Sequence, residues 1–396
     1  MSVSGAGTGE SGGFGPGAVL NPTWDVVVIG GGMIGLAIAY HLSRRQARVL
    51  LLERGDLVQA ASGANAGRAQ TMEAHFGLNL SLVKRGHLCL AALDEELGYD
   101  IEWRAMGNLV LIGKERHWRE WSARAEKLSA EGIATEMLPR AQVQKLEPGL
   151  VVESFLGAAF GMEANVNPFK LCWAYARAAR RGGAYLCPHT PATGLVIEKG
   201  RIQAVLAGAE RYTAGCVVVA AGPWTAQVTG WAGEAAPVGF HYAEAMVTEP
   251  LPSVLNHHIG LAGFYELIHT SQRATTAGVL QTSGGNILIT EAVEQTEELH
   301  ARSTEWGISG MAAKALQLLP WLRHVRLIRD WGVPSAVSPD EEPILGWAGS
   351  VDNMFVAGRL HLNIATLPVI SDLAAAMVLG EAVEPSLEAY SPQRFA

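Results

Sequence analysis

The chain contains few cysteines for its length of 396 residues. There are four, Cys89, Cys172, Cys187 and Cys216, and they form no CxxC pair and no Cys/His spacing that is typical of a zinc site. The chain also has no cluster of cysteines that could hold an iron–sulfur centre. We therefore expect buried thiols in a reducing compartment, and no metal site.

Basic clusters and long apolar runs are also missing. Lys and Arg number 30 and Asp and Glu 38, so that the formal net charge is −8. This balance argues against a nucleic-acid partner and does not support a role at a membrane surface. The chain has no stretch close to the roughly 18 consecutive apolar residues that indicate a transmembrane helix.

The first 22 residues hold seven glycines and three serines. They lack the basic start and the apolar run of a secretory signal, so we expect a flexible lead-in and a cytoplasmic protein. With 49% hydrophobic and 17% charged residues, the chain has the composition of an ordinary globular protein. Its length allows one large domain or two interlocked domains.

The most informative segment is the motif GGGMIG at residues 30–35. An apolar run, 26–29, precedes it, and a helical stretch and a second apolar run, 49–52, follow. This order of strand, glycine turn, helix and strand is the mononucleotide-binding half of a Rossmann fold. The second run ends in Glu53, whose carboxylate can accept hydrogen bonds from ribose hydroxyls.

The three glycines of this motif have different tasks. Gly30 allows a tight turn out of the strand, and Gly32 lets the backbone approach a pyrophosphate. Gly35 lets the helix pack close to the sheet. A pyrophosphate would then lie on the helix N-terminus, where free N–H groups and the helix dipole favour an anion.

Apolar periodicity and turn residues predict the other elements. Helices are expected over 78–97, 117–130, 169–181 and 371–379, and strands over 193–198, 202–206, 216–221 and 354–358. The region 235–295 is rich in β-branched residues and turn signals, which favours an antiparallel sheet. The predicted fold class is α/β, with two domains: a Rossmann-like cofactor-binding domain and an inserted antiparallel β-sheet domain for the substrate.

Two further strands narrow the cofactor to FAD. The segment 217–225 is an apolar strand that ends in Ala-Gly with a tryptophan just beyond, and 356–358 is a second strand that ends in glycine. Cofactor contacts at both ends of so long a chain are typical of FAD. A lone glycine motif would not distinguish FAD from NAD.

From Trp24 to Leu379 the chain resembles the D-amino acid oxidase family of FAD-dependent oxidoreductases. This family includes glycine oxidase, sarcosine oxidase and the flavoprotein subunits of hydrogen cyanide synthase, proline dehydrogenase and opine oxidases. The matching motifs are GGGMIG at 30–35, Glu53-Arg54, ASGANAG at 61–67, VVVAAGPWT at 217–225, SPDEEPILG at 338–346 and FVAG at 355–358.

The resemblance implies a domain division and a set of cofactor contacts. After the lead-in at 1–22, residues 23–90, 150–235 and 325–396 are expected to form the FAD-binding domain, and 91–149 and 236–324 the substrate domain. The implied FAD contacts are Gly30, Gly31, Gly32, Met33, Ile34, Gly35, Glu53, Arg54, Ser62, Asn65, Ala66, Gly67, Val196, Ala221, Gly222, Trp224 and Gly358. No counterpart of a flavin-anchoring cysteine can be placed, so FAD is expected to be noncovalent.

The chain departs from the family pattern where relatives bind the substrate carboxylate. The segment 331–336 has no arginine, and the segment 359–368 is shorter and lacks the second glycine of the family loop. The family's carboxylate clamp therefore does not carry over. Arg68 directly follows the loop at 61–67, which is called the flavin loop below. The sequence does not give the direction of the Arg68 side chain.

Candidate substrate contacts lie in the middle of the chain. His241, Glu244 and Tyr265 follow the point where relatives enter the substrate sheet, although each is more often a structural residue of a strand. His257 and His258 form a pair without a third ligand at suitable spacing, so we expect an exposed loop rather than a metal site.

The resemblance implies oxidation of an amine by hydride transfer to flavin N5. The missing clamp favours the FAD subunit of a multi-subunit dehydrogenase or oxidase that acts on an opine, an imino acid or an N-substituted amino acid. By resemblance, its partner subunits could carry an iron–sulfur cluster. Two alternatives stay open: a self-sufficient sarcosine, glycine or D-amino acid oxidase, and a flavin-binding assembly subunit without turnover.

Overall fold

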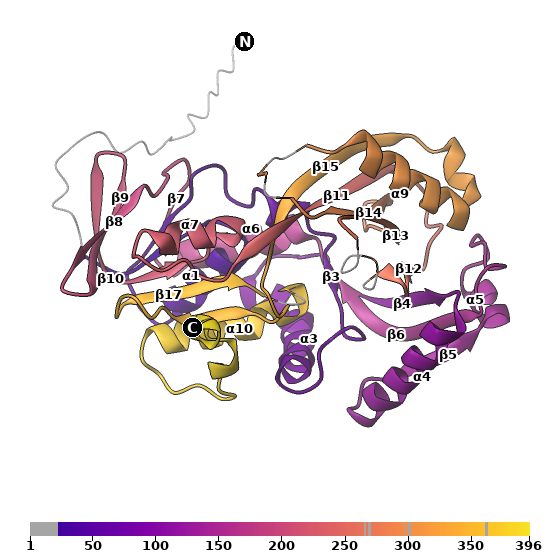
Figure 1. Ribbon diagram of the computed structural model, residues 1–396, viewed down its shortest axis with the longest axis horizontal. Coiled ribbons are helices and arrows are strands. Elements are labelled where there is room, and N and C mark those ends of the chain that lie inside the picture. Colours follow the sequence, from indigo (N-terminus) through magenta and orange to yellow (C-terminus); the bar gives the residue numbers. More distant parts are fainter. Residues whose placement is uncertain (1–22, 265–266, 268–270, 297, 300–301, 361–362) are drawn as a thin grey trace, which may run out of the picture.

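The computed structural model describes residues 23–264, 267, 271–296, 298–299, 302–360 and 363–396. Two β-sheets of 8 and 9 strands form the two halves of the molecule, with helices packed against each (Figure 1). No described helix is both long enough and apolar enough to cross a lipid bilayer.

The first sheet contains the glycine motif. Its strands are β1 (Trp24–Ile29), β2 (Val49–Leu52), β7 (Tyr185–Cys187), β8 (Gly194–Glu198), β9 (Arg201–Ala207), β10 (Glu210–Val219), β16 (Ile344–Trp347) and β17 (Met354–Arg359). Its helices are α1 (Met33–Arg44), α3 (Leu78–Leu97), α6 (Pro168–Arg181), α7 (Thr225–Gly230) and α10 (Asn363–Val378). The order β16-β17-β10-β1-β2-β7 puts β1 inside the sheet, where it pairs in parallel with β2 and β10.

Strand β1 is apolar on both sides because both faces of this sheet are covered. Val26 and Val28 face a core that includes α1, whereas Val27 and Ile29 face a second core that includes β9. Such two-sided burial explains a continuous apolar run in a parallel strand. On the first face α1 packs between α6 and α10, and α3 packs against α10.

The second sheet carries the middle of the chain. Its strands are β3 (Arg68–Ala69), β4 (Arg104–Ile112), β5 (Thr135–Pro139), β6 (Gly157–Asn165), β11 (Gly239–Pro250), β12 (His257–Leu261), β13 (Arg273–Gln281), β14 (Asn286–Glu294) and β15 (Leu327–Val337). Helices α4 (Glu115–Ala130), α5 (Arg140–Leu146) and α9 (Glu305–Leu318) belong to the same half, and the one-turn helix α2 (Ala61–Ala64) lies in the flavin loop. Most pairs are antiparallel, but β4 and β12 are parallel.

The two faces of β11 have different surroundings. Met246 packs in one core with Met311 of α9, whereas Ala245 packs in another with Ala66 and Trp331. Since side chains alternate along a strand, the even-numbered residues near this point face α9 and the odd-numbered ones face the flavin loop. This alternation decides which residues of the strand can reach a cofactor.

Most of the predicted elements are confirmed, with differences of a few residues at their ends. The helix predicted over 371–379 is wrong at its start, because α10 begins at Asn363 and continues through Pro368. Proline inside a helix removes one backbone hydrogen bond, which explains why this stretch resembles a loop in the sequence. The sequence did not predict β4 and β6.

Sheet membership also differs from the predicted domain boundaries. Strands β3, β6 and β15 pair within the second sheet, although their residues fall in segments assigned to the FAD-binding domain. The chain crosses between the two sheets more often than the boundaries assume. The exact domain division stays a prediction.

Candidate flavin and substrate site

The glycine turn between β1 and α1 is too crowded for side chains. Gly30 has a φ of +115°, and a Cβ there would lie 2.3 Å from the Ala220 carbonyl oxygen. A Cβ on Gly35 would lie 2.0 Å from the Gly30 carbonyl oxygen. The turn therefore requires glycine at both positions, and it places the N-terminus of α1 at the carboxyl end of β1.

This helix N-terminus has the features of an anion site. Gly32 is the N-cap, α1 has no acidic residue in its first turn, and the Met33 N–H donates to Ser62 Oγ at 2.9 Å. Met33, Ile34 and Gly35 form the first turn of α1, where backbone N–H groups have no partner within the helix, and Ser62 takes only that of Met33. This end of α1 therefore suits an anion. The residues fit the diphosphate of FAD.

Glu53 lies at the end of β2, beside the glycine turn. Its Oε2 accepts from the Gly31 N–H at 2.7 Å and its Oε1 from the Gly55 N–H at 2.9 Å. These bonds fix the carboxylate beside the glycine turn, and its contact with the ribose stays a prediction. The next residue, Arg54, places its guanidinium 3.6 Å from the ring centre of Trp224, so two further predicted contacts lie together.

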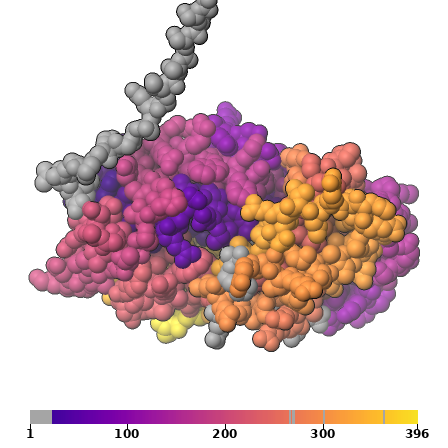
Figure 2. Space-filling model, turned by 90° about the horizontal axis from the view of Figure 1, so that it is seen from above, coloured from indigo at the N-terminus to yellow at the C-terminus, as the bar shows by residue number. Residues whose placement is uncertain are grey.

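The loop that includes α2 runs beside this turn. Asn65 Oδ1 accepts from the Gly67 N–H at 2.7 Å, and Asn65 Nδ2 donates to Asn363 Oδ1 at 3.4 Å. Gly67 has a φ of +75°, and a Cβ there would lie 2.0 Å from the Val166 carbonyl oxygen. The loop is thus fixed between α10 and the residue that follows β6. Figure 2 shows this early, violet part of the chain at the surface between the two halves.

The remaining predicted contacts lie on three strands or just after them. Ala221 and Gly222 follow β10, and Gly222 has a φ of +52°. Gly358 lies in β17, where a Cβ would meet Val238 Cγ2 at 2.7 Å. Val196 lies on β8, which is joined to β10 through β9. Their roles as FAD contacts stay predictions.

A cavity of about 240 Å³ opens where the flavin loop meets the second sheet. It is lined by Ala61, Ala64, Asn65, Ala66, Arg68, Gln70, Ala243, Glu244, Ala245, Thr290, Glu291, Trp331, Val333, Ser335 and Asn363. Trp331 Nε1 donates to the Ala64 carbonyl oxygen at 3.3 Å, which ties β15 to the flavin loop. The cavity therefore joins the predicted flavin loop to three strands of the second sheet, β11, β14 and β15.

Arg68 is the cation of this cavity. Its Nη2 lies 3.5 Å from Glu163 Oε2 and 3.9 Å from Glu73 Oε2. Its Nε is buried and has no hydrogen-bond partner among the residues that the structure describes. A buried N–H donor without a partner is a costly arrangement in a folded protein. It would be relieved by an acceptor on a molecule bound in the cavity.

Glu291 is presented to the cavity by a bulge in β14. Ala245 and Glu244 on β11 pair with Thr290 and Ala292, so Glu291 is the extra residue between them. Bulges of this kind re-aim side chains and are frequent beside active sites. Burial raises the pKa of the Glu291 carboxyl to about 7, although the charge of Arg68 acts in the opposite direction. Glu291 therefore titrates near neutral pH.

The structure changes the view of the predicted substrate contacts. Glu244 is only 2% exposed, and its carboxylate accepts from the backbone N–H and the hydroxyl of Thr304, the N-cap of α9. Its side chain thus faces α9, although Glu244 is among the residues that line the cavity. His241 lies on the odd-numbered face of β11, beyond the lining residues. Tyr265 lies outside the described residues.

The histidine pair is not an exposed loop, and this prediction was wrong. His257 and His258 begin β12; His257 Nδ1 lies 2.7 Å from Glu147 Oε1, and His258 Nδ1 lies 2.7 Å from Asn108 Oδ1. His258 is 3% exposed. The described part of the chain contains no group of three or more side chains that could hold a metal ion.

Sequence reasoning missed Glu291 and left the direction of Arg68 open. No spacing marks Glu291, because a bulge is set by pairing between distant strands. Trp331 occupies the segment noted for its missing arginine, and the structure makes it a wall of the cavity.

A Rossmann unit beside a second, mainly antiparallel sheet, with a cavity between them, is the arrangement expected of a flavin-dependent oxidoreductase. The family model described as FAD dependent oxidoreductase (DAO) matches residues 25–377, and the chain belongs to this family. FAD is its cofactor.

Known relatives cover nearly the whole chain. The hydrogen cyanide synthase subunit HcnC of Pseudomonas aeruginosa is 25% identical over 421 residues, which span 95% of this chain and 97% of that protein. Glycine oxidase of Geobacillus kaustophilus is 26% identical, and the match spans 89% of this chain and 92% of that protein. The crystal structure of L-proline dehydrogenase from P. horikoshii has a TM-score of 0.84 at 22% identity. The match covers 95% of this chain and 98% of that one, so the two proteins share the fold.

Proposed function

We propose that this chain oxidises the carbon–nitrogen bond of an amino acid or an N-substituted amino acid, such as an opine or imino acid, as the FAD subunit of a larger dehydrogenase or oxidase. The observation that carries the proposal is the cavity between the flavin loop and the second sheet, with Arg68 and Glu291 in its wall. One cation and one carboxyl of raised pKa suit a substrate that has both a carboxylate and an amine.

Bound FAD supplies the hydride acceptor, and the protein supplies binding and orientation. Arg68 is the group that binds the substrate carboxylate. Its unpartnered Nε gains an acceptor in the complex, and a planar guanidinium can grip a carboxylate through two N–H groups. Arg68 thus takes the place of the family arginine that the segment 331–336 lacks.

Glu291 receives the proton of the substrate amine. A substrate ammonium group and the ionised Glu291 become a neutral amine and a carboxylic acid, so charge and protons balance. Only the neutral amine has the nitrogen lone pair that stabilises loss of hydride from the adjacent carbon. The resulting imine is then hydrolysed by water. A carboxyl with a pKa of about 7 suits this exchange near neutral pH.

The subunit role is supported by the relative HcnC, whose name describes a subunit and which the chain matches over 97% of its length. All four cysteines are free thiols and are far apart in sequence, so an iron–sulfur cluster would have to reside on a partner. Full peroxide-forming turnover by the isolated, monomeric yellow chain would overturn this part of the proposal. That outcome would favour a self-sufficient oxidase, as in the glycine oxidase relative.

The substrate class is tested by substrate variants that differ in one group. An N-methyl amino acid, its methyl ester and the matching simple amine are each mixed anaerobically with the holoprotein, and flavin absorbance is followed. We expect the free acid to bleach the flavin at least tenfold more efficiently than the ester or the amine. Equal efficiency of all three would exclude a carboxylate-binding role for Arg68.

A further inference from the structure

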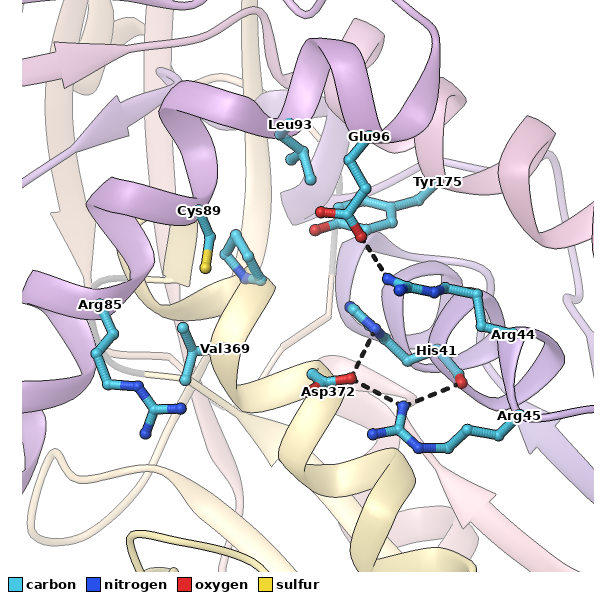
Figure 3. Close-up of a pocket in the computed structure, with 11 residues that line it drawn as sticks. His41, Arg44, Arg45, Arg85, Cys89, Leu93, Glu96, Tyr175, Val369 and Asp372 are labelled. Atoms are coloured by element: carbon cyan, nitrogen blue, oxygen red, sulfur yellow. Dashed lines mark hydrogen bonds and ion pairs between the residues drawn. The ribbon is translucent and has the colours of Figure 1, made fainter.

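A second cavity, of about 530 Å³, lies away from the flavin site (Figure 3). It is lined by residues of four helices, α1, α3, α6 and α10, and is open to solvent on one side. His41 lies in its wall eight positions after Met33, so that at about 1.5 Å per residue roughly 12 Å of helix separates the diphosphate end of α1 from this cavity. The two sites are therefore distinct.

The cavity contains three guanidinium groups with different partners. Arg44 pairs with Glu96, and Arg45 pairs with Asp372 at 2.8 Å. Arg85 donates to the carbonyl oxygen of Glu384 at 3.1 Å, which is a neutral acceptor. The charge of Arg85 is thus not offset by that contact. Figure 3 shows Arg85 at the opposite end of the view from Arg44.

Two buried side chains at the inner side of the cavity have polar atoms without partners. Tyr175 is 0% and His41 5% exposed. The Tyr175 hydroxyl and His41 Nε2 have no hydrogen-bond partner within the described residues. Burial raises the pKa of Tyr175 well above its ordinary value, so the hydroxyl keeps its proton and can donate. Buried polar groups of this kind usually have a partner.

Apolar side chains also contribute to the wall of this cavity. Leu93 and Val369 are 1% and 5% exposed, and both line the cavity. A small molecule that fits this cavity therefore meets an apolar surface, the guanidinium of Arg85 at one end, and the polar atoms of Tyr175 and His41 at the inner side.

We propose that this cavity binds a small organic anion, a carboxylate or a phosphate monoester on an apolar body. The body lies against Leu93 and Val369, the charged group on Arg85, and a hydrogen bond from the ligand reaches Tyr175 or His41. This site is independent of the proposed oxidation and of its substrate.

The test is calorimetric titration of the FAD-loaded full chain with three probes that share one ring system. They are 1-naphthyl phosphate, 1-naphthoate and the neutral 1-naphthylmethanol. We expect both anions to bind with one-to-one stoichiometry and the alcohol to bind at least tenfold more weakly. Tighter binding of the phosphate probe would indicate a phosphate monoester as the ligand, and tighter binding of 1-naphthoate would indicate a carboxylate. Equal affinity for the alcohol, or no binding of either anion at millimolar concentration, would overturn the proposal.

Variants locate the bound probe. R85Q should weaken anion binding at least tenfold, whereas K84Q, which removes a neighbouring charge outside the cavity wall, should leave it unchanged. Y175F should weaken binding severalfold without lowering the unfolding temperature, since the hydroxyl has no partner within the described chain to lose. R68Q, in the flavin cavity, should have no effect on this affinity. Loss of binding in R68Q but not in R85Q would place the probe in the flavin cavity and refute the assignment.

Discussion

Replacement of Glu291 by glutamine should make the protein more stable near pH 8 while it slows the oxidation. Glutamine keeps the shape of the side chain and removes its charge. Burial raises the pKa of Glu291 from 4.5 to about 7, so at alkaline pH the native protein holds a carboxylate where a charge is disfavoured. The glutamine variant does not bear this cost.

The size and the sign of the effect follow from the two pKa values. Below pH 4.5 the carboxyl is protonated in the folded and the unfolded protein, and its contribution to stability is fully present. From pH 4.5 to about 7 the unfolded chain releases the proton while the folded protein keeps it, so stability falls as the pH rises. At about 1.4 kcal/mol per pKa unit the loss is at most roughly 3.5 kcal/mol, and solvent that reaches the side chain lowers it.

The assay is urea unfolding of both proteins at several pH values with FAD in excess. The stability difference in favour of E291Q should grow from near zero at pH 4.5 to about 2 kcal/mol at pH 8, below the limit given by the pKa shift. E294Q is the control on the same strand. Glu294 pairs with Arg273 at 2.7 Å, so this variant should gain nothing. A difference that does not change with pH, or an E291Q protein that is less stable at pH 8, would refute the reasoning.

The same variant tests the role of Glu291 in the reaction. Loss of a positioned proton acceptor slows a reaction about 100-fold or more. Anaerobic flavin reduction by E291Q should be slower by this factor at pH 7.5 and should recover at higher pH, where the substrate amine loses its proton to solvent. A rate that stays low at every pH would indicate a structural role instead.

Three further predictions concern the walls of the site. Arg68→Met should raise KM for carboxylate-bearing amines about tenfold or more with little change for amines that lack a carboxylate, and Arg68→Lys should restore only part of the loss, because lysine has no fork of N–H groups; steady-state kinetics checks both. Gly35→Ala should abolish retention of FAD on gel filtration and lower the unfolding temperature, because its Cβ would lie 2.0 Å from the Gly30 carbonyl oxygen. Glu244→Ala should cost about 2 kcal/mol in urea unfolding through lost bonds to Thr304, without shifting the pH profile of flavin reduction.

Features that depend on local order along the chain were predictable from the sequence. Gly30, Gly35 and Glu53 belong to a short motif whose spacing reflects one turn and one helix, and the structure brings them together as expected. The helices α3 and α6 were equally predictable, because apolar residues recur with the helical period in each and Asn167 caps the N-terminus of α6.

Features that depend on pairing between distant segments were not predictable. The side chain of Glu244 faces α9 because of its register on β11, and Glu291 reaches the cavity because β14 has one extra residue there. Neither the strand register nor the bulge can be recognised in a single sequence. The early start of α10 was hidden by Pro368, since tertiary packing overrides the low helix propensity of proline.

The central claim is that this chain oxidises carbon–nitrogen bonds with bound FAD, and anaerobic reduction of its flavin tests this most directly. D-amino acids, N-methyl amino acids, proline derivatives and opines are each mixed with the holoprotein, with the hydrogen on the oxidised carbon replaced by deuterium in a parallel sample. We predict that at least one of these classes bleaches the flavin and that deuterium slows the bleaching, because the carbon–hydrogen bond breaks in that step. Bleaching by dithionite but by none of these amines would contradict the account.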